Sequence, residues 1–324
     1  MNRLRAYRFL EDISQQELGA LLGLSTAMVS AVESGRRSFT GDLRRIGYSP
    51  ERFSIPDMSM PLHRHKASTR VSAKNRAQEL LRLGGEVFSE LRDRTERAPT
   101  LSLERLPSPS SLVDLEDLAL ETRYLLGHEE LGPIRNLTAA VERAGVCIIP
   151  IRGLDGIDGL SAWVGNTPVI GVSPIVPGDR LRYTIGHELC HLIFHRRRSD
   201  GIENEANRFA GAILFPRAEF DAAMPERPQL RDFSNLKSAW GVSVAALVYR
   251  AHELGYLDDS RYRALQIQMS KWHKVEPAHF EPALGNLLPK LVEVNGGLQA
   301  VASALGVNDK HLAAVTNWSH LRLA

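Results

Sequence analysis

The chain has 324 residues, of which 43% are hydrophobic and 24% charged, which is the composition of a globular protein with two or three domains. A net charge of +2 means that any nucleic-acid binding has to depend on a local basic patch. Two cysteines and the lack of an apolar run near the roughly 20 residues of a membrane span exclude a disulfide framework, a cysteine-rich zinc finger and a membrane partner, so we expect a cytoplasmic protein.

Two short helices are predicted near the N-terminus. Ser14 can cap a helix over Gln15–Leu22, and Ser25 can cap a second helix that ends at Glu33. Gly23 supplies the turn between them.

These residues, SQQELGALLGLS followed by VSAVESGRR, resemble the Xre-type (Cro/repressor-like) helix-turn-helix. The resemblance implies that residues 1–55 bind operator DNA, as a homodimer on a palindrome. It also implies which side chains face the major groove: Gln15, Thr26, Ala27 and Ser30. Arg36 and Arg37 would contact phosphate. The buried core of the two helices would comprise Ala20, Leu24, Val29 and Val32.

Residues 36–66 carry a modest excess of positive charge, enough for weak phosphate binding. The basic residues are Arg36, Arg37, Arg44, Arg45, Arg52, Arg64 and Lys66, and the acidic residues are Asp42, Glu51 and Asp57. The alternative interpretation is a helix-turn-helix fold that makes only protein contacts.

Residues 56–110 are predicted to be a linker followed by a helix over 73–95, which Gly84–Gly85 would weaken. Prolines and serines then mark a boundary, and a new domain over 111–228 begins with Ser110 or Ser111 as a helix cap. Its predicted helices cover 112–126, 136–144, 180–195 and 202–214. Its predicted strands are Val146–Ile151, Gly159–Val164 and Pro168–Val172, with a turn at Gly165–Asn166.

Residues 229–324 are predicted to be a helical region, with modules near 233–255 and 284–318. The second module has a helix–Gly–Val–helix outline but few basic residues, so we interpret it as a protein-contact or packing module. The whole chain is therefore expected to be mainly α, of the α+β class.

The segment HELCH, residues 187–191, predicts a metal site on a helix. His187 and His191 stand four residues apart, so both imidazoles lie on one helix face and can bind one ion. Catalytic Zn²⁺ sites have three protein ligands and a water. Glu188 follows the first histidine and can act as the general base toward that water.

The third ligand is expected on the next helix. Glu203 and Asn207 are four residues apart, so Glu203 can bind zinc while Asn207 holds the second nitrogen of a histidine. Glu205 is the alternative ligand, although its neighbour Phe209 belongs to the core. His195 also lies on the zinc face and could bind metal or the transition state, but we favour a solvated helix end.

TIGHELCHLIFH followed by ENEANRFAGAILFP resembles the ImmA/IrrE family of zinc metallopeptidases, and the likeness extends over about residues 111–280. The resemblance implies a zincin-like domain with a small β-sheet, Zn²⁺ bound by His187, His191 and Glu203, and Glu188 as the catalytic base. Many members have glycine where this chain has Cys190, which we interpret as a small buried residue.

The combined pattern predicts a DNA-binding regulator with a zinc endopeptidase domain. By the family resemblance its substrate would be a specific protein, a helix-turn-helix repressor or antitoxin cut during stress. The alternative is a transcriptional regulator or toxin–antitoxin component whose zinc domain senses or scaffolds without proteolysis.

Overall fold

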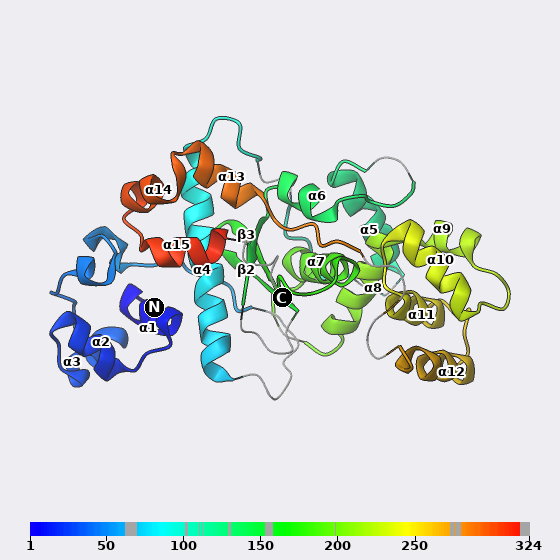
Figure 1. The fold of residues 1–324 in the computed structure, drawn as a ribbon, viewed down its shortest axis with the longest axis horizontal. Helices are drawn as coiled ribbons and strands as arrows, with labels where there is room; N and C mark the ends of the chain where they lie inside the picture. The colour runs from blue at the N-terminus through cyan, green and yellow to red at the C-terminus, as the bar shows by residue number, and fades with distance from the viewer. Residues whose placement is uncertain are drawn as a thin grey trace. The chain divides into compact units, whose positions relative to one another are not determined.

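The computed structural model describes residues 1–61, 70–100, 103–109, 111, 113–128, 131–152, 158–197, 199–272, 276 and 280–317. Within these residues the fold is mainly helical with one three-stranded sheet (Figure 1), which agrees with the predicted α+β class. Three residues that carried predictions, Arg64, Lys66 and Ser110, lie outside the described residues. A helix both long and apolar enough to cross a membrane is not found in the described part of the chain.

The chain divides into two compact units, each assembled from separated stretches of sequence. The first unit combines Met1–Thr100, Gly145–Ser173 and Gly285–Ala324, and the second combines Leu101–Ala144 and Pro174–Leu284. The domain boundaries predicted from the sequence divide the chain into consecutive segments instead. They remain predictions.

The first unit contains helices from both ends of the chain and the whole sheet. Its helices are α1 (Arg3–Glu11), α2 (Gln15–Leu22), α3 (Thr26–Glu33), the 3₁₀ turns η1 (Leu43–Ile46) and η2 (Pro50–Phe53), α4 (Val71–Asp93), α13 (Leu287–Val294), α14 (Gly297–Leu305) and α15 (Asp309–Thr316). Its strands are β1 (Cys147–Pro150), β2 (Gly159–Val164) and β3 (Thr167–Val172).

The helix pair α2–α3 begins and ends where the capping residues predict. The Ser14 hydroxyl accepts a hydrogen bond from the amide of Glu17, whose carboxylate accepts one from Ser14 in return. Gly23 adopts a left-handed conformation with φ of 70°, which glycine adopts without strain. Val29 and Val32 are buried as expected, but Ala20 is exposed, and Leu18 and Leu22 fill the core instead.

The long helix α4 packs along the sheet (Figure 1), whose strand order is β1-β3-β2 with β1 parallel and β2 antiparallel to β3. Gly84–Gly85, expected to weaken this helix, do not interrupt it, since α4 runs from Val71 to Asp93. A Cβ on Gly84 would lie 3.0 Å from Ile149, and one on Gly85 would lie 2.7 Å from Val164. The two glycines therefore allow the sheet to approach the helix closely.

The C-terminal helices α13–α15 pack against α4 and the N-terminal elements within the same unit. The amide of Ser49 donates to the carbonyl of Gly306 at 2.9 Å. Buried His311 lies between the Tyr48 hydroxyl, 2.8 Å from Nδ1, and the Glu11 carboxylate, 2.7 Å from Nε2. The packing role predicted for this module agrees with these contacts.

Arg3 and Glu86 form a buried ion pair between α1 and α4 in the first unit. Arg3 Nη2 lies 2.6 Å from one Glu86 carboxylate oxygen, and Arg52 Nη1 lies 3.1 Å from the same oxygen. Arg52 also pairs with Glu90 and has only 16% of its side chain exposed, so it is not part of an accessible basic patch.

Glu86→Ala should lower the free energy of unfolding by about 3–5 kcal/mol, because it leaves the buried Arg3 charge without its partner. Urea denaturation measures the change. The matched control is Asp93→Ala on the same helix, where the carboxylate is 65% exposed and about 1 kcal/mol or less is expected. Equal losses for the two variants would contradict this account.

The regular elements among the described residues of the second unit are all helices. Its helices are α5 (Asp114–Leu125), α6 (Leu137–Arg143), α7 (Gly178–Phe194), α8 (Ile202–Leu214), α9 (Arg217–Ala223), α10 (Leu230–Trp240), α11 (Val244–Glu253) and α12 (Asp259–Ser270). The Ser111 hydroxyl accepts a hydrogen bond from the amide of Asp114, where α5 begins.

Helices α7 and α8 pack closely because small residues line their contact. A Cβ on Gly186 would lie 3.3 Å from the Cα of Ala210, and Ala206 and Ala210 are fully buried. Phe194 and Phe209 close the interface with an edge-to-face contact, their ring centroids 5.6 Å apart. This close packing at the two alanines sets the spacing between the side chains of the two helices.

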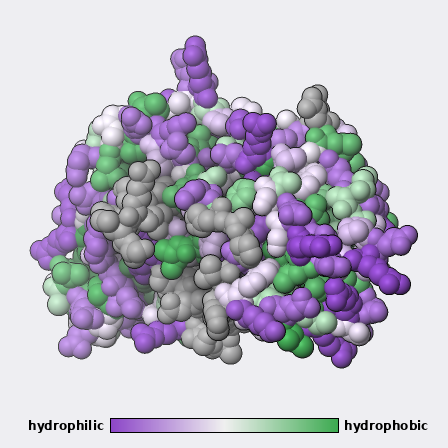
Figure 2. Space-filling view, turned by 45° about the vertical axis from the view of Figure 1, so that its right-hand side comes forward, coloured by the Kyte–Doolittle hydropathy of each residue, from purple (hydrophilic) through white to green (hydrophobic). Residues whose placement is uncertain are grey.

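Figure 2 shows that one face of the molecule is largely hydrophilic, with apolar residues in small, separate groups. Apolar residues scattered in this way are ordinary on a protein surface, whereas a broad apolar patch would mark a docking site.

Candidate metal centre

Helix α7 presents two histidines that face one another. The Nε2 atoms of His187 and His191 lie 3.1 Å apart, and the ring centroids are 4.8 Å apart. Two nitrogen atoms at this distance either share a proton in a hydrogen bond or, when both lone pairs point inward, bind a cation between them. The four-residue spacing therefore places both rings as the sequence predicts.

Helix α8 brings a carboxylate to the same point. The Glu203 carboxylate oxygens lie 3.6 Å from His187 Nε2 and 3.7 Å from His191 Nε2. One ligand atom from each of the three residues lies within 4.8 Å of the others.

These distances fit a zinc ion. Bonds of about 2.0–2.2 Å in a tetrahedral site place the ligand atoms about 3.3–3.6 Å apart, close to the 3.1, 3.6 and 3.7 Å found. Two imidazoles and a carboxylate are also a common donor set for catalytic zinc. The 3.6 and 3.7 Å distances involve different Glu203 oxygens, so the three residues can hold a metal ion after a small side-chain adjustment.

Asn207 lies on the outer side of His187. Its Oδ1 is 3.0 Å from His187 Nδ1. With Nε2 directed at the metal position, Nδ1 carries the proton and donates it to this oxygen, which fixes the ring orientation. Asn207 therefore lies where the sequence expects it to support a ligand.

Glu205 lies away from the metal position, although the sequence left it open as the alternative ligand. Its Oε2 is 2.9 Å from His195 Nε2, and His195 Nδ1 is 2.7 Å from His191 Nδ1. The expectation of a solvated helix end at His195 is wrong, because only 7% of the residue is exposed. Burial lowers the pKa of His195 more than Glu205 raises it, which favours the neutral ring.

The end of α7 beyond His191 is covered by the segment 103–109. The Leu106 amide donates to the carbonyl of Ile193 at 2.9 Å, and the Ser108 hydroxyl donates to the carbonyl of Phe194 at 3.0 Å. These bonds satisfy carbonyls that a helix end leaves without partners. They bring the segment 103–109 against the helix end next to His195, a contact that no local sequence pattern indicates.

Glu188 lies beside the histidines and is only 3% exposed. Burial lowers the pKa of His187, but the hydrogen bond to Glu203 and the negative charges of Glu188 and Glu203 outweigh it, so the net shift is upward. The same field that attracts a proton attracts a metal cation. Because zinc binds the deprotonated ring, zinc affinity should fall as the pH falls.

Cys190 is fully buried, as the sequence analysis expects. Burial raises the pKa of its thiol well above the usual value, and the charges of Glu205 and Glu188 add to the shift. Cys147, in the first unit, is also buried. A neutral, inaccessible thiol is a poor nucleophile.

Neither cysteine should react with Ellman's reagent at pH 8 while the protein is folded, and both should react in denaturant. Absorbance of the released thiolate follows the reaction. Rapid labelling of one thiol in the native protein would show that Cys190 or Cys147 is accessible.

The residues expected to contact DNA lie on or next to α2–α3 in the first unit. Thr26, Ala27, Arg36 and Arg37 are exposed, and Ser30 is partly exposed. Gln15 is partly exposed, and its amide donates to the Glu33 carboxylate at 2.8 Å. Arg8 holds the same carboxylate at 2.8 Å, so this cluster fastens α1 and α2 to α3.

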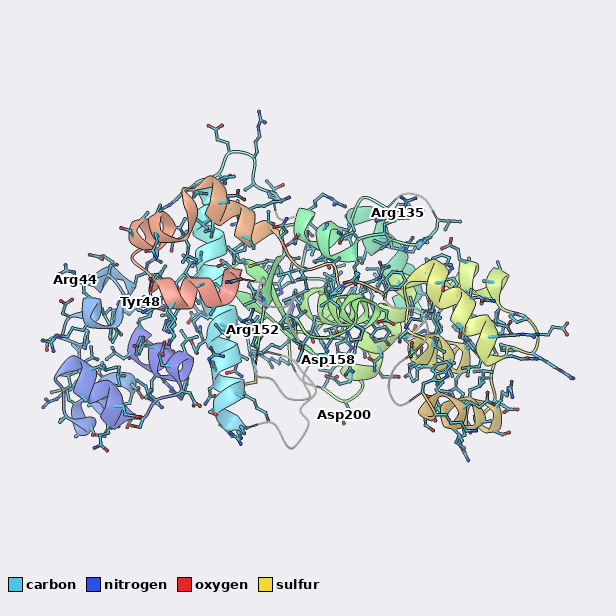
Figure 3. All side chains as sticks on the ribbon, viewed as in Figure 1. Arg44, Tyr48, Arg135, Arg152, Asp158 and Asp200 are labelled. Carbon is cyan, nitrogen blue, oxygen red and sulfur yellow. The ribbon has the colours of Figure 1, made fainter. Side chains whose placement is uncertain are left out.

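Further positive charge lies on η1. Arg44, labelled in Figure 3, has 74% of its side chain exposed. The exposed part of the predicted basic patch thus consists of Arg36, Arg37, Arg44 and Arg45 among the described residues.

A protein-family model matches part of the chain. Residues 141–252, about a third of the chain, match the model of the Peptidase M78 family, described as the IrrE N-terminal-like domain. The matched range contains the sheet, α7 and α8 and ends within α11. Comparison with curated proteins gives no match. The matched region is therefore similar to a zinc metallopeptidase-type domain and supports the ImmA/IrrE part of the resemblance, whereas the N-terminal helix-turn-helix lies outside it.

Proposed function

We propose that this chain is a DNA-binding transcriptional regulator whose metallopeptidase-type domain is a zinc-dependent endopeptidase that cuts a specific protein. The observation that carries the peptidase proposal is the approach of His187, His191 and Glu203 to one point beside buried Glu188. The family match over residues 141–252 supports the same reaction class.

Each residue has a distinct part in the proposed hydrolysis. His187, His191 and Glu203 hold the ion, and Asn207 orients His187 through its Nδ1 proton. A zinc ion bound there supplies Lewis acidity toward a peptide carbonyl and lowers the pKa of water. Glu188 accepts the proton of the attacking water and then delivers it to the leaving amine.

We propose that the substrate is a helix-turn-helix repressor or antitoxin, the class implied by the family resemblance. The test uses the purified, zinc-loaded chain and the small helix-turn-helix proteins encoded by neighbouring reading frames. Mass spectrometry should detect one or a few cleavage sites, lost with a zinc chelator and restored by added zinc. Intact proteins in the presence of a stoichiometrically zinc-loaded chain would favour the alternative, a domain that senses or scaffolds without proteolysis.

We further propose that residues 1–55 bind operator DNA as part of a homodimer, with α3 in the major groove. The evidence for this proposal comes from residues on and next to α3. Thr26 and Ala27 are exposed at its start, and Arg36 and Arg37 follow its end. The bonds from Arg8 and Gln15 to Glu33 brace α3 against α1 and α2.

Replacing Arg36 and Arg37 by alanine should weaken DNA binding to all sequences alike, because arginines that contact phosphate do not read bases. The slope of log affinity against log salt should fall by about 2, roughly one for each lost cation. Fluorescence anisotropy with the protein's own promoter between 50 and 200 mM salt measures the slope. Arg231→Ala in the second unit, also highly exposed, is the control, and an unchanged slope in the double variant would contradict the proposal.

A further inference from the structure

We propose that His195 and Glu205 are positioning residues of the metal centre, which hold the ring of His191 in the orientation and tautomer that metal binding requires. The inference rests on the proposed metal site. It assigns a role to two buried polar groups of α7 and α8 that binding by His187, His191 and Glu203 does not use.

The three side chains form a continuous line leading away from the metal position. His191 Nε2 faces His187 and Glu203, while His191 Nδ1 lies 2.7 Å from His195 Nδ1. On its far side, His195 Nε2 lies 2.9 Å from the Glu205 carboxylate. The side chains of His191 and His195 are almost fully buried, so water does not compete at these bonds.

Hydrogen-bond chemistry fixes the proton positions along this line. A neutral His191 that binds metal through Nε2 carries its proton on Nδ1 and donates it to His195 Nδ1. His195 must then be neutral as well, with its own proton on Nε2, which donates to Glu205. A protonated His195 would direct a second N–H at the His191 N–H.

The effect on the metal follows from this arrangement. A histidine ligand that donates its second proton to a partner keeps its orientation and gains basicity. Here the Glu205 carboxylate acts on the ligand His191 indirectly. It polarises His195, and His195 in turn holds the His191 ring. Losing such a partner lowers metal affinity roughly 10- to 100-fold.

A purely structural role predicts something different. If the His195–Glu205 pair only fastened α7 to α8, its removal would destabilise the metal-free protein and leave zinc affinity nearly unchanged. Zinc affinity and the unfolding free energy of the metal-free protein therefore distinguish the two roles.

The test compares His195→Leu, His195→Gln and Glu205→Ala with the full-length chain. Competition with a chromophoric zinc chelator gives the dissociation constant of zinc, and urea denaturation with chelator present gives the stability of the metal-free state. His195→Leu and Glu205→Ala should each raise the dissociation constant roughly 10- to 100-fold. Glutamine supplies both an acceptor and a donor, so His195→Gln should recover most of the affinity.

The double variant His195→Leu with Glu205→Ala should lose no more zinc affinity than His195→Leu alone, because Glu205 acts through His195. The control is His252→Gln, since His252 also lies 2.9 Å from a carboxylate, that of Asp259 on α12, but away from the site. Additive losses, no recovery with glutamine, or unchanged affinity in the single variants would overturn the inference. Absence of zinc binding by the unaltered chain would instead overturn the proposed metal site.

Should His195→Leu fail to fold, Glu205→Gln keeps the size and one acceptor of the carboxylate but removes its charge. It should raise the dissociation constant of zinc by less than Glu205→Ala does. Wild-type affinity in both Glu205 variants would also overturn the inference.

Discussion

Glu188→Gln should reduce peptide cleavage by roughly 10²–10⁴-fold, the contribution of a well-placed general base, while zinc stays bound at one equivalent. Glutamine fills the same buried volume but cannot accept the proton of the attacking water. Because Glu188 is not one of the three clustered ligand residues, its replacement removes a proton acceptor and no metal ligand.

Rates of substrate cleavage are measured with enzyme in excess, alongside zinc content by elemental mass spectrometry. Asp200→Asn is the matched control, since Asp200 is an exposed carboxylate just before α8, labelled in Figure 3. Retained cleavage in Glu188→Gln would remove Glu188 from the reaction. Loss of zinc together with activity would mean that Glu188 is needed to hold the metal.

Glu203→Ala should lower zinc affinity by more than the roughly 10- to 100-fold expected for a residue that only supports a ligand. The change removes one of three ligands and also the negative charge 3.6–3.7 Å from both histidine nitrogens. Competition with a chromophoric chelator at pH 7.5 measures the affinity.

Two comparisons make the result specific to Glu203. Asn204→Ala, at the neighbouring exposed position on α8, should bind zinc as the unaltered chain does. Glu205→Ala should lose less affinity than Glu203→Ala. Stoichiometric, tightly bound zinc in Glu203→Ala would assign the third ligand to Glu205 or His195.

Local sequence patterns were sufficient to predict several of the helices and part of the candidate site. Capping residues located α2 and α3, and a four-residue spacing placed His187 and His191 on one face of α7. The same spacing paired Glu203 with Asn207 on α8. These features depend on the regular geometry of the helix, in which residues four apart lie on the same face.

Contacts between distant segments could not be predicted in the same way. The segment 103–109, far from His195 in sequence, binds the helix end next to it, and Glu205 from the next helix pairs with its ring. Gly84–Gly85 suggested a weak helix. Their role in packing could not be predicted, because their partners, Ile149 and Val164, lie far along the chain. Periodicity records which face of an element is buried, but it does not identify what covers that face.

The most direct test of the central claim is a crystal structure of the zinc-loaded chain with anomalous diffraction measured on both sides of the zinc absorption edge. We predict one strong anomalous peak on α7–α8, about 2.0–2.2 Å from His187 Nε2, His191 Nε2 and a Glu203 carboxylate oxygen. A zinc ion bound by Glu205 or His195 in place of Glu203, or no anomalous peak between the two histidines, would contradict the proposed metal centre.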